Sequence, residues 1–347
     1  MTKTTSTQFN ADTEALEVAK AFAASIHGKN ILITGVNRQG IGFATAQAFA
    51  SQSPQSITIT GRSQTKMQES LDALRKEYPN VAYASIEMDL SSQKSVQTAA
   101  DQVLKSDKAI GILVNNAGVM LIPERQLSED GIEMHFATNH IGHFLFTNLI
   151  VPKLSKGARV VNLSSSSPTQ AGVRFSDINF DKTNNTLPAE EQPQYEPLKH
   201  WGVTDPEQKS YIPREAYNQS KVSNLLFSIG FNKRFHQRGI TSFAVNPGVI
   251  QTELQRHMPP EMFASLQNAV KNGLFKVKTQ ATGAATTLVA ATDPALGAPE
   301  ANDGKENYGV YLSDCQISTG ALAKAESNEN ADRLWNLSER LVGQSFA

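Results

Sequence analysis

The chain is poor in cysteine, in unbalanced charge and in long apolar runs. Its 347 residues include one cysteine, Cys315, so no intrachain disulfide forms and no oxidising compartment is required. The net charge of −1 leaves no cationic surplus for a nucleic-acid backbone or an anionic membrane surface. No stretch approaches the ~20 apolar residues of a membrane span. We therefore expect a cytoplasmic protein without nucleic-acid partners and without a membrane span.

We also expect no targeting segment, no internal repeats and no interdomain linker. Residues 1–28 carry acidic residues, no arginine and no apolar core of secretory length, which is not typical of a signal or transit peptide. Their apolar residues recur at helical spacing and predict a helix that packs on the rest of the chain: Leu16, Ala19, Phe22, Ala23 and Ile26. Because no Gly/Ser-rich or Pro-rich linker divides the chain, we expect one large domain.

Beyond residue 30, short β-branched runs alternate with longer segments of helical periodicity. The predicted strands cover residues 31–34, 56–60, 81–88, 110–115, 159–164, 241–246 and 308–312. The predicted helices between the first five of them cover residues 40–51, 65–78, 93–105 and 132–151. Most of the strands are apolar at consecutive positions, as strands buried on both faces are. The pattern therefore predicts an α/β fold, a doubly wound parallel sheet of about seven strands.

Two segments interrupt this alternation. Residues 168–213 contain six prolines and little periodicity, which predicts a functional loop or an ordered insertion. We expect its residues around Tyr195 to Tyr211 to cover the substrate rather than the cofactor. Trp201 within it lines a substrate mouth or anchors the loop. Residues 250–280 hold a Pro-Pro pair and a short amphipathic stretch, which we interpret as a substrate lid. The apolar residues of that stretch favour a lipophilic substrate, although they are equally suited to packing on the domain: Met262, Phe263, Leu266, Val270, Leu274 and Phe275.

A glycine-rich turn joins the first predicted strand to the first predicted helix. Such a turn lets backbone N–H groups approach a pyrophosphate, which the positive end of the helix stabilises. The arrangement predicts a Rossmann-type dinucleotide site that uses Gly35, Asn37, Arg38, Gly40, Ile41 and Gly42.

The second strand ends in Gly61-Arg62-Ser63, where a domain that binds NAD usually places an acidic residue for the ribose hydroxyls. A guanidinium cannot accept hydrogen bonds from those hydroxyls, but it pairs with a 2′-phosphate. Arg62 therefore predicts NADP(H) as the cofactor. Arg38, inside the glycine turn, is a second candidate for the same phosphate.

Together with these features, further motifs resemble those of the short-chain dehydrogenase/reductase superfamily. They are Asp89-Leu90, Asn115-Asn116-Ala117-Gly118, Asn139, the serines 164–167, Tyr217-x-x-x-Lys221 and Asn246-Pro247-Gly248-Val249 with Thr252. Four further segments are similar to those of fungal retinol-dehydrogenase-like and WW-domain-oxidoreductase-like members: DINFDKT (177–183), KTQATGAATTLVAAT (278–292), YLSDC (311–315) and LWNLSERLVG (334–343). The glycine turn departs from the family because four residues, where three are usual, separate Gly35 from Gly40. The resemblance covers roughly residues 29–315.

The resemblance implies a role for each motif. Asp89 and Leu90 would contact the adenine, and residues 116–118 would line the cofactor site. Pro247, Gly248, Val249 and Thr252 would contact the nicotinamide end. Lys221 would bind the nicotinamide ribose, and Asn139 would hold a water that links Lys221 to solvent.

The tyrosine of the motif is suited to moving a proton. A phenol has an ordinary pKa near 10, so at neutral pH about 0.1% is phenolate and a nearby cation is needed to favour that form. Tyr217 and Lys221 are four residues apart on a predicted helix that runs to residue 238, which places both on one face. In reduction, Tyr217 would donate a proton to the carbonyl oxygen. Ser165 would stabilise the developing alkoxide, with Ser164 and Ser166 as alternatives.

A second Tyr-x-x-x-Lys pair, Tyr195 and Lys199, contains Pro197. Proline removes an amide donor and disfavours helix at the preceding residue, so we expect no shared helical face for this pair. His135, His140 and His143 are not spaced as a helical zinc pair, so we expect them on a helix surface without a metal.

The sequence thus predicts an N-terminal helical extension over residues 1–28, a dinucleotide-binding domain over 29–320 and a C-terminal helical tail over 321–347. The predicted activity is NADP(H)-dependent interconversion of a lipophilic aldehyde or ketone and its alcohol, with a small-molecule substrate. The alternative is a non-catalytic NADP-binding redox sensor or partner-binding protein on the same fold. Homo-oligomerisation is left open.

Overall fold

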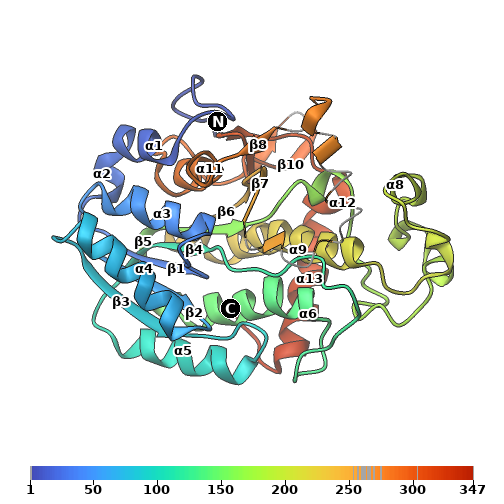
Figure 1. Cartoon of the computed structure of the whole chain (residues 1–347). Coiled ribbons are helices and arrows are strands. Elements are labelled where there is room, and N and C mark those ends of the chain that lie inside the picture. Colours follow the sequence, from blue (N-terminus) through green and yellow to red (C-terminus); the bar gives the residue numbers. More distant parts are fainter. Residues whose placement is uncertain are drawn as a thin grey trace.

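The computed structural model describes residues 2–252, 254–255, 258, 263, 267–268, 270–273, 276–302 and 304–346 (Figure 1). Its centre is an eight-stranded sheet in the order β12-β11-β6-β5-β4-β1-β2-β3. The strands are β1 Asn30–Thr34, β2 Ser56–Gly61, β3 Ala82–Glu87, β4 Ile110–Asn115, β5 Leu154–Leu163, β6 Thr241–Asn246, β11 Tyr311–Ser313 and β12 Gln316–Ile317.

The sheet is parallel except at one edge. Every neighbouring pair is parallel apart from β11 and β12, which are antiparallel. The predicted doubly wound parallel sheet is confirmed. The additional strand, β12, arises because Asp314 and Cys315 both adopt positive φ and turn the chain back at the edge.

Two layers of helices cover the sheet because its strands are apolar on both faces. In β1, Leu32 belongs to one core cluster, whereas Ile31 and Ile33 belong to the other. The first cluster is built with α5 Gln93–Lys105, α7 Gly142–Leu149, α9 Pro213–Phe235 and α13 Asn328–Val342. The second is built with α1 Ala15–Ala21, α3 Ile41–Ala50, α4 Gln64–Glu77 and α11 Gln280–Thr292.

The remaining elements are short. They are α2 Ala23–Ile26, α6 Met134–Phe136, α8 Tyr195–His200, α12 Ala323–Glu326, β7 Val249–Ile250, β8 Val277–Lys278, β9 Glu300–Asn302 and β10 Lys305–Tyr308. Strand β7 pairs with β8, and β9 pairs with β10, outside the main sheet. No helix in the described ranges combines the length and the apolar character that crossing a bilayer requires.

Both ends of the chain pack onto the sheet layers. Helix α1 contacts α3 and α11, with Val18 buried. Leu16, expected on the packed face, is 46% exposed, because the helix presents Ala15, Val18 and Ala19 to the core instead. At the other end, α13 packs on α9, with Trp335 buried. The division at residues 28 and 320 stays a prediction.

The predicted helix 132–151 is interrupted. A π-helical turn, Ala137–Ile141, separates α6 from α7. The expectation that its three histidines lie on a helix surface is wrong, because His135, His140 and His143 are all at most 1% exposed. Burial lowers the pKa of His140 to about 3 and that of His143 to about 4, so both are neutral. Within the described ranges, no group of three or more His, Cys, Asp or Glu is arranged to hold a metal ion.

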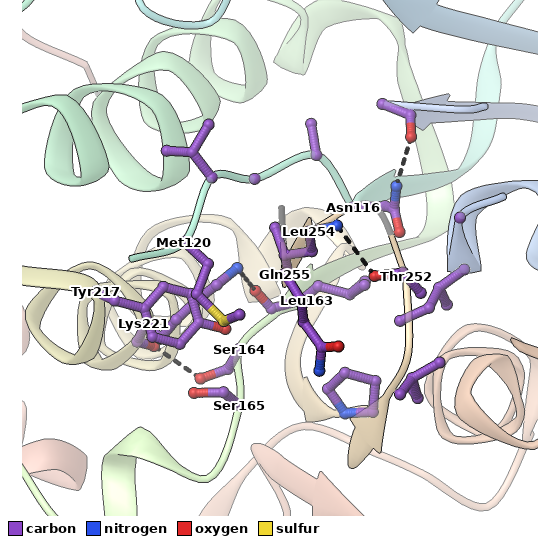
Figure 2. A pocket seen from close by; sticks show the side chains of 18 of the residues that line it. Asn116, Met120, Leu163, Ser164, Ser165, Tyr217, Lys221, Thr252, Leu254 and Gln255 are labelled. Atoms are coloured by element: carbon purple, nitrogen blue, oxygen red, sulfur yellow. Dashed lines mark hydrogen bonds between the residues drawn. The ribbon is translucent and has the colours of Figure 1, made fainter. Parts of the chain in front are cut away.

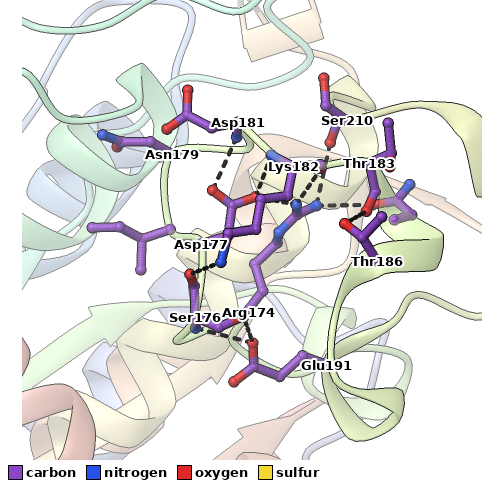
Figure 3. A network of polar contacts seen from close by, with 12 residues as sticks. Arg174, Ser176, Asp177, Asn179, Asp181, Lys182, Thr183, Thr186, Glu191 and Ser210 are labelled. Atoms are coloured by element: carbon purple, nitrogen blue, oxygen red, sulfur yellow. Dashed lines mark hydrogen bonds and ion pairs between the residues drawn. The ribbon is translucent and has the colours of Figure 1, made fainter.

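Residues 168–213 form an ordered insertion that contains α8 and several short 3₁₀ turns. A buried arginine organises it (Figure 3). Arg174 forms an ion pair with Asp177, donates to Asn184 Oδ1 at 2.8 Å and lies over the ring of Phe180. Its guanidinium also donates to the backbone carbonyls of Lys182 and Ser210. Much of the predicted lid at 250–280, including Met262, Leu266, Leu274 and Phe275, lies outside the described residues.

Candidate active site

A cavity of about 1190 Å³ lies at the carboxyl ends of the parallel strands. Residues that directly follow β1, β2, β4, β5 and β6 line it: Gly35, Arg62, Asn116, Ser164 and Pro247. In open α/β sheets ligands bind at this edge. Strands β4 and β1 lie between β5 and β2 in the sheet. Three spacings of ~4.8 Å between neighbouring strands therefore put the ends of β5 and β2 about 14 Å apart. The volume of the cavity exceeds the roughly 300–1,000 Å³ of an ordinary small-molecule site, which leaves room for a large ligand and a second, small molecule.

Close backbone approach explains the glycines of the first turn. Gly35 has φ +69°, and a Cβ there would lie 2.6 Å from the Cα of Ala117. A Cβ on Gly42 would lie 2.6 Å from Nδ2 of Asn116. That amide donates to the carbonyl oxygens of Thr34 at 2.8 Å and Gly35 at 3.0 Å, so it joins the ends of β1 and β4.

Most residues predicted for the cofactor line the cavity. These are Gly35, Asn37, Gly40, Ile41, Arg62, Asp89, Leu90, Asn116, Ala117, Gly118, Tyr217, Lys221, Pro247, Gly248, Val249 and Thr252. Gly42 and Arg38 are outside the lining. Arg38 and Arg62 are both exposed. The guanidinium of Arg38 lies 4.7 Å from the ring centroid of Phe43. Arg62 lines the cavity, and no hydrogen bond or ion pair holds it within the described ranges.

Tyr217 and Lys221 face the same end of the cavity (Figure 2). Both lie on α9, and Lys221 Nζ is 5.8 Å from the phenol ring centroid. Burial raises the pKa of Tyr217 to about 12, and a hydrogen bond with Ser165 opposes that rise. Burial lowers the pKa of Lys221 to about 8. At neutral pH the phenol is therefore protonated and the lysine is mainly charged.

The competing pair, Tyr195 and Lys199, does lie on a helix. The expectation that Pro197 prevents a helix is wrong, because Pro197 is in the first turn of α8, where its missing N–H would have no partner. Neither Tyr195 nor Lys199 lines the cavity. Lys199 instead forms an ion pair with Glu207 at 2.6 Å.

The serines after β5 differ in their surroundings. Ser164 is buried and donates to the backbone oxygen of Lys221 at 2.7 Å. Ser165 lines the cavity and is the serine that lowers the pKa of the Tyr217 phenol, and its hydroxyl donates to Ser167 Oγ at 2.7 Å. Ser166 is exposed. Ser165 is therefore the serine of this run whose hydroxyl meets Tyr217.

Asn139 lies behind the cavity rather than in its lining. Its Oδ1 accepts from the N–H of Val119 at 2.8 Å, and its Nδ2 donates to the carbonyl of Val119 at 2.9 Å and to Ser220 Oγ at 2.8 Å. Its side chain thus fixes the loop after β4, which carries the lining residues Met120 and Leu121.

Some residues that line the cavity were not predicted from the sequence. Lys278 and Asp314 form an ion pair of 2.5 Å beside Gly248, although they are 36 residues apart in sequence and carry no motif. Arg214 is three residues before Tyr217, so helical spacing alone places both on one side of α9. Trp201 lines the cavity, which favours the first of its two expected roles.

Comparisons with known proteins agree with this architecture. The family described as short chain dehydrogenase matches residues 29–176. The chain is 42% identical to the oxidoreductase fscI of Fusarium equiseti over 246 residues, 69% of this chain and 94% of that protein. It is 33% identical to retinol dehydrogenase 12 of Mus musculus, over 92% of this chain and 87% of that protein.

The fold also matches a solved enzyme. The L-sorbose reductase of Gluconobacter frateurii, complexed with NADPH and L-sorbose, superposes with a TM-score of 0.57 at 16% identity, over 86% of this chain and 97% of that one. The match is one of fold. The relatives, in contrast, share sequence over most of their length, and the chain therefore belongs to the short-chain dehydrogenase/reductase superfamily of oxidoreductases.

Proposed function

We propose that this protein is an NADP(H)-dependent oxidoreductase that interconverts a lipophilic carbonyl compound and its alcohol, with Tyr217 as the general acid and base. The observation that carries the proposal is the convergence of Tyr217, Lys221 and Ser165 at one end of a cavity whose other end holds Arg62. The retinol dehydrogenase among the relatives supports this reaction class.

The residues at the far end of the cavity fit NADP(H). Arg62 faces the cavity as an unpaired cation within the described part of the chain, and Gly61 and Ser63 flank it in place of an acidic side chain. An unpaired guanidinium is suited to the 2′-phosphate that distinguishes NADPH from NADH. The L-sorbose reductase structure contains NADPH, which is consistent with this preference.

Tyr217 would exchange a proton with the substrate oxygen. The bound nicotinamide supplies a hydride to a carbonyl carbon or accepts one from an alcohol. Because the pKa of Tyr217 is raised to about 12, the phenol is held protonated and ready to donate in the reductive direction. In the oxidative direction Tyr217 must act as a base, and the ammonium of Lys221 would favour its phenolate form.

Ser165 would stabilise the oxygen on which negative charge develops. Its hydroxyl lies against the phenol of Tyr217, so both groups can reach one substrate oxygen. Ser167 anchors Ser165 through two bonds: the Ser165 hydroxyl donates to Ser167 Oγ, and the Ser167 N–H donates to Ser165 Oγ at 3.0 Å. The hydroxyl would turn from Ser167 to the substrate when the substrate binds.

The test is NADPH consumption with a panel of aldehydes, ketones and quinones, measured beside the dissociation constant for NADPH. Turnover that Tyr217→Phe lowers by about 10²–10⁴ supports the proposal that the protein is an enzyme. Tight NADPH binding without turnover on any member of the panel would instead support the redox sensor or partner-binding protein. The cytoplasmic location stays a prediction, and homo-oligomerisation stays open.

A further inference from the structure

Arg214 enters the cavity beside the proton donor. It is the second residue of α9 and precedes Tyr217 by three residues, so their Cβ atoms are about 5–6 Å apart on one side of the helix. Both side chains line the cavity. A cation therefore lies within the length of a small molecule from the phenol.

Neutral neighbours hold the Arg214 side chain. Its Nη2 donates to Oε1 of Gln170 at 2.9 Å, and its guanidinium carbon lies 4.8 Å from the ring centroid of Trp201. Both of these neighbours also line the cavity. Because guanidinium has several N–H donors, the bond to Gln170 leaves others to meet a ligand. Burial lowers the pKa of Arg214, and the charge of the adjacent Glu215 opposes that shift.

The adjacent carboxylate points elsewhere. Glu215 Oε1 accepts from Nδ2 of Asn218 at 3.0 Å, and Glu215 borders a separate cavity of about 30 Å³ together with Arg174 and Lys324. No ion pair joins Arg214 to a carboxylate within the described ranges.

Lys221 is the other cation next to Tyr217, and its ammonium is bonded to the carbonyl oxygen of Leu163 at 2.9 Å. The remaining charged residues of the cavity are paired or remote. Lys278 pairs with Asp314 and Lys276 with Asp12. The charged groups that follow β2 and β3 lie near the proposed 2′-phosphate site, several strands from Tyr217. The same cavity also has apolar lining residues, Met120, Leu121 and Leu254, beside neutral polar ones such as Ser165, Gln170 and Asn218. An anionic group on an apolar molecule would complement this surface.

We infer that Arg214 binds a carboxylate of the substrate, and that the substrate class is an apolar aldehyde or ketone that carries such a group. The inference rests on the proposed function, because it orients the substrate carbonyl toward Tyr217. A carboxylate accepts two parallel bonds from a guanidinium, which would fix the distance from Arg214 to the reacting carbon. Trp201 and Gln170 act as positioning residues that hold the guanidinium in place.

Two aldehydes of matched shape test this assignment: para-carboxybenzaldehyde, which is anionic, and para-formylbenzamide, which is neutral. The value of kcat/KM with NADPH is measured for both. We expect the wild type to prefer the acid by about ten- to a hundredfold, the factor typical of a charge-assisted hydrogen bond. Arg214→Gln should bring the ratio of the two values close to one, mainly through KM for the acid, and Arg214→Lys should restore part of it.

Arg234→Gln is the matched control. Arg234 lies on the same helix with its guanidinium over Trp335 at 4.0 Å, but it is outside the cavity lining, so its loss should leave the ratio unchanged. Equal turnover of both aldehydes by the wild type, or an unchanged ratio in Arg214→Gln, would overturn the inference while the proposed function stands.

A binding measurement distinguishes failure of the proposed function from failure of the Arg214 inference. If no aldehyde is turned over, the proposed function fails, and the dissociation constant of para-carboxybenzyl alcohol for the protein with NADP⁺ then decides on Arg214. Weakening of about tenfold or more in Arg214→Gln, and not in Arg234→Gln, upholds the carboxylate site. Equal affinities in all three proteins reject it. Thermal unfolding of each variant establishes that it is folded.

Discussion

The ammonium of Lys221 donates a 2.9 Å hydrogen bond to the carbonyl oxygen of Leu163, and no ion pair joins it to a carboxylate in the described part of the chain. The residue is 4% exposed. Burial therefore lowers its pKa from 10.5 to about 8. The protein thus keeps a charge in a dry site next to Tyr217, at a cost in stability that depends on pH.

We predict a pH-dependent stability difference between the wild type and Lys221→Met without cofactor. Between about pH 8 and 10.5 the unfolded chain holds the Lys221 proton more tightly than the native protein does, so native stability rises with pH. The free energy of unfolding of the wild type should gain on the order of 3 kcal/mol relative to Lys221→Met across this window. Urea denaturation at several pH values measures it.

Lys233→Met serves as the control, because Lys233 is an exposed residue of the same helix, paired with Asp332. It should show little of the pH-dependent gain. A difference between wild type and Lys221→Met that stays flat from neutral to alkaline pH would mean that Lys221 is not desolvated.

Replacing the proton donor should separate chemistry from binding. Tyr217→Phe removes the hydroxyl that meets Ser165, and we expect kcat to fall by about 10²–10⁴ while the dissociation constant for NADPH changes little. Tyr195→Phe is the matched control, because Tyr195 lies outside the cavity and donates to Gln192 instead. A large loss of kcat in Tyr195→Phe with normal turnover in Tyr217→Phe would reject the proposed mechanism.

Arg62 should determine the cofactor preference. Arg62→Ala should weaken NADPH by about 1.5–3 kcal/mol, about ten- to a hundredfold, and leave NADH nearly unaffected. Arg38→Ala is the control, because Arg38 lies over Phe43 outside the cavity lining. Dissociation constants of both cofactors for the three proteins provide the measurement. If Arg38→Ala alone lowers the NADPH preference, the phosphate site belongs to the glycine turn.

The buried ion pair of the insertion should stabilise the fold. Arg174→Ala leaves Asp177 without its charged partner in a site where both side chains are at most 6% exposed, and we expect a loss of about 3–5 kcal/mol. Arg125→Ala breaks an exposed pair with Asp181 in the same region and should cost at most about 1 kcal/mol. Denaturant titration compares the two. Equal losses would mean that the Arg174 network does not hold the insertion.

Much of the architecture could be predicted from the sequence because it depends on local patterns. The β-branched runs predict the strands, and the glycine turn after residue 34 predicts the first strand-to-helix junction. The spacing of Tyr217 and Lys221 predicts their shared helical face, which requires only the helical repeat.

Contacts between distant segments could not be read in this way. His140 is buried because α13 and α9 cover it, through Ser338 and Phe227, and His143 is buried against Thr34 of β1. The sequence near the histidines does not show these distant contacts. Pro197 is accommodated because α8 begins only two residues earlier, a boundary that the proline itself does not reveal.

The amino-acid sequence by itself determined the order of the elements, the position of the glycine turn and the pairing of Tyr217 with Lys221, because each depends on residues within a few positions of one another. Only the tertiary structure decided that Ser165 rather than Ser164 or Ser166 acts on the pKa of the Tyr217 phenol, and that Arg214 rather than Glu215 lines the cavity. The physical reason is that neighbouring residues at the end of a strand or on a helix point in different directions, and the packing of α9 and the insertion against the sheet selects which of them reaches the site.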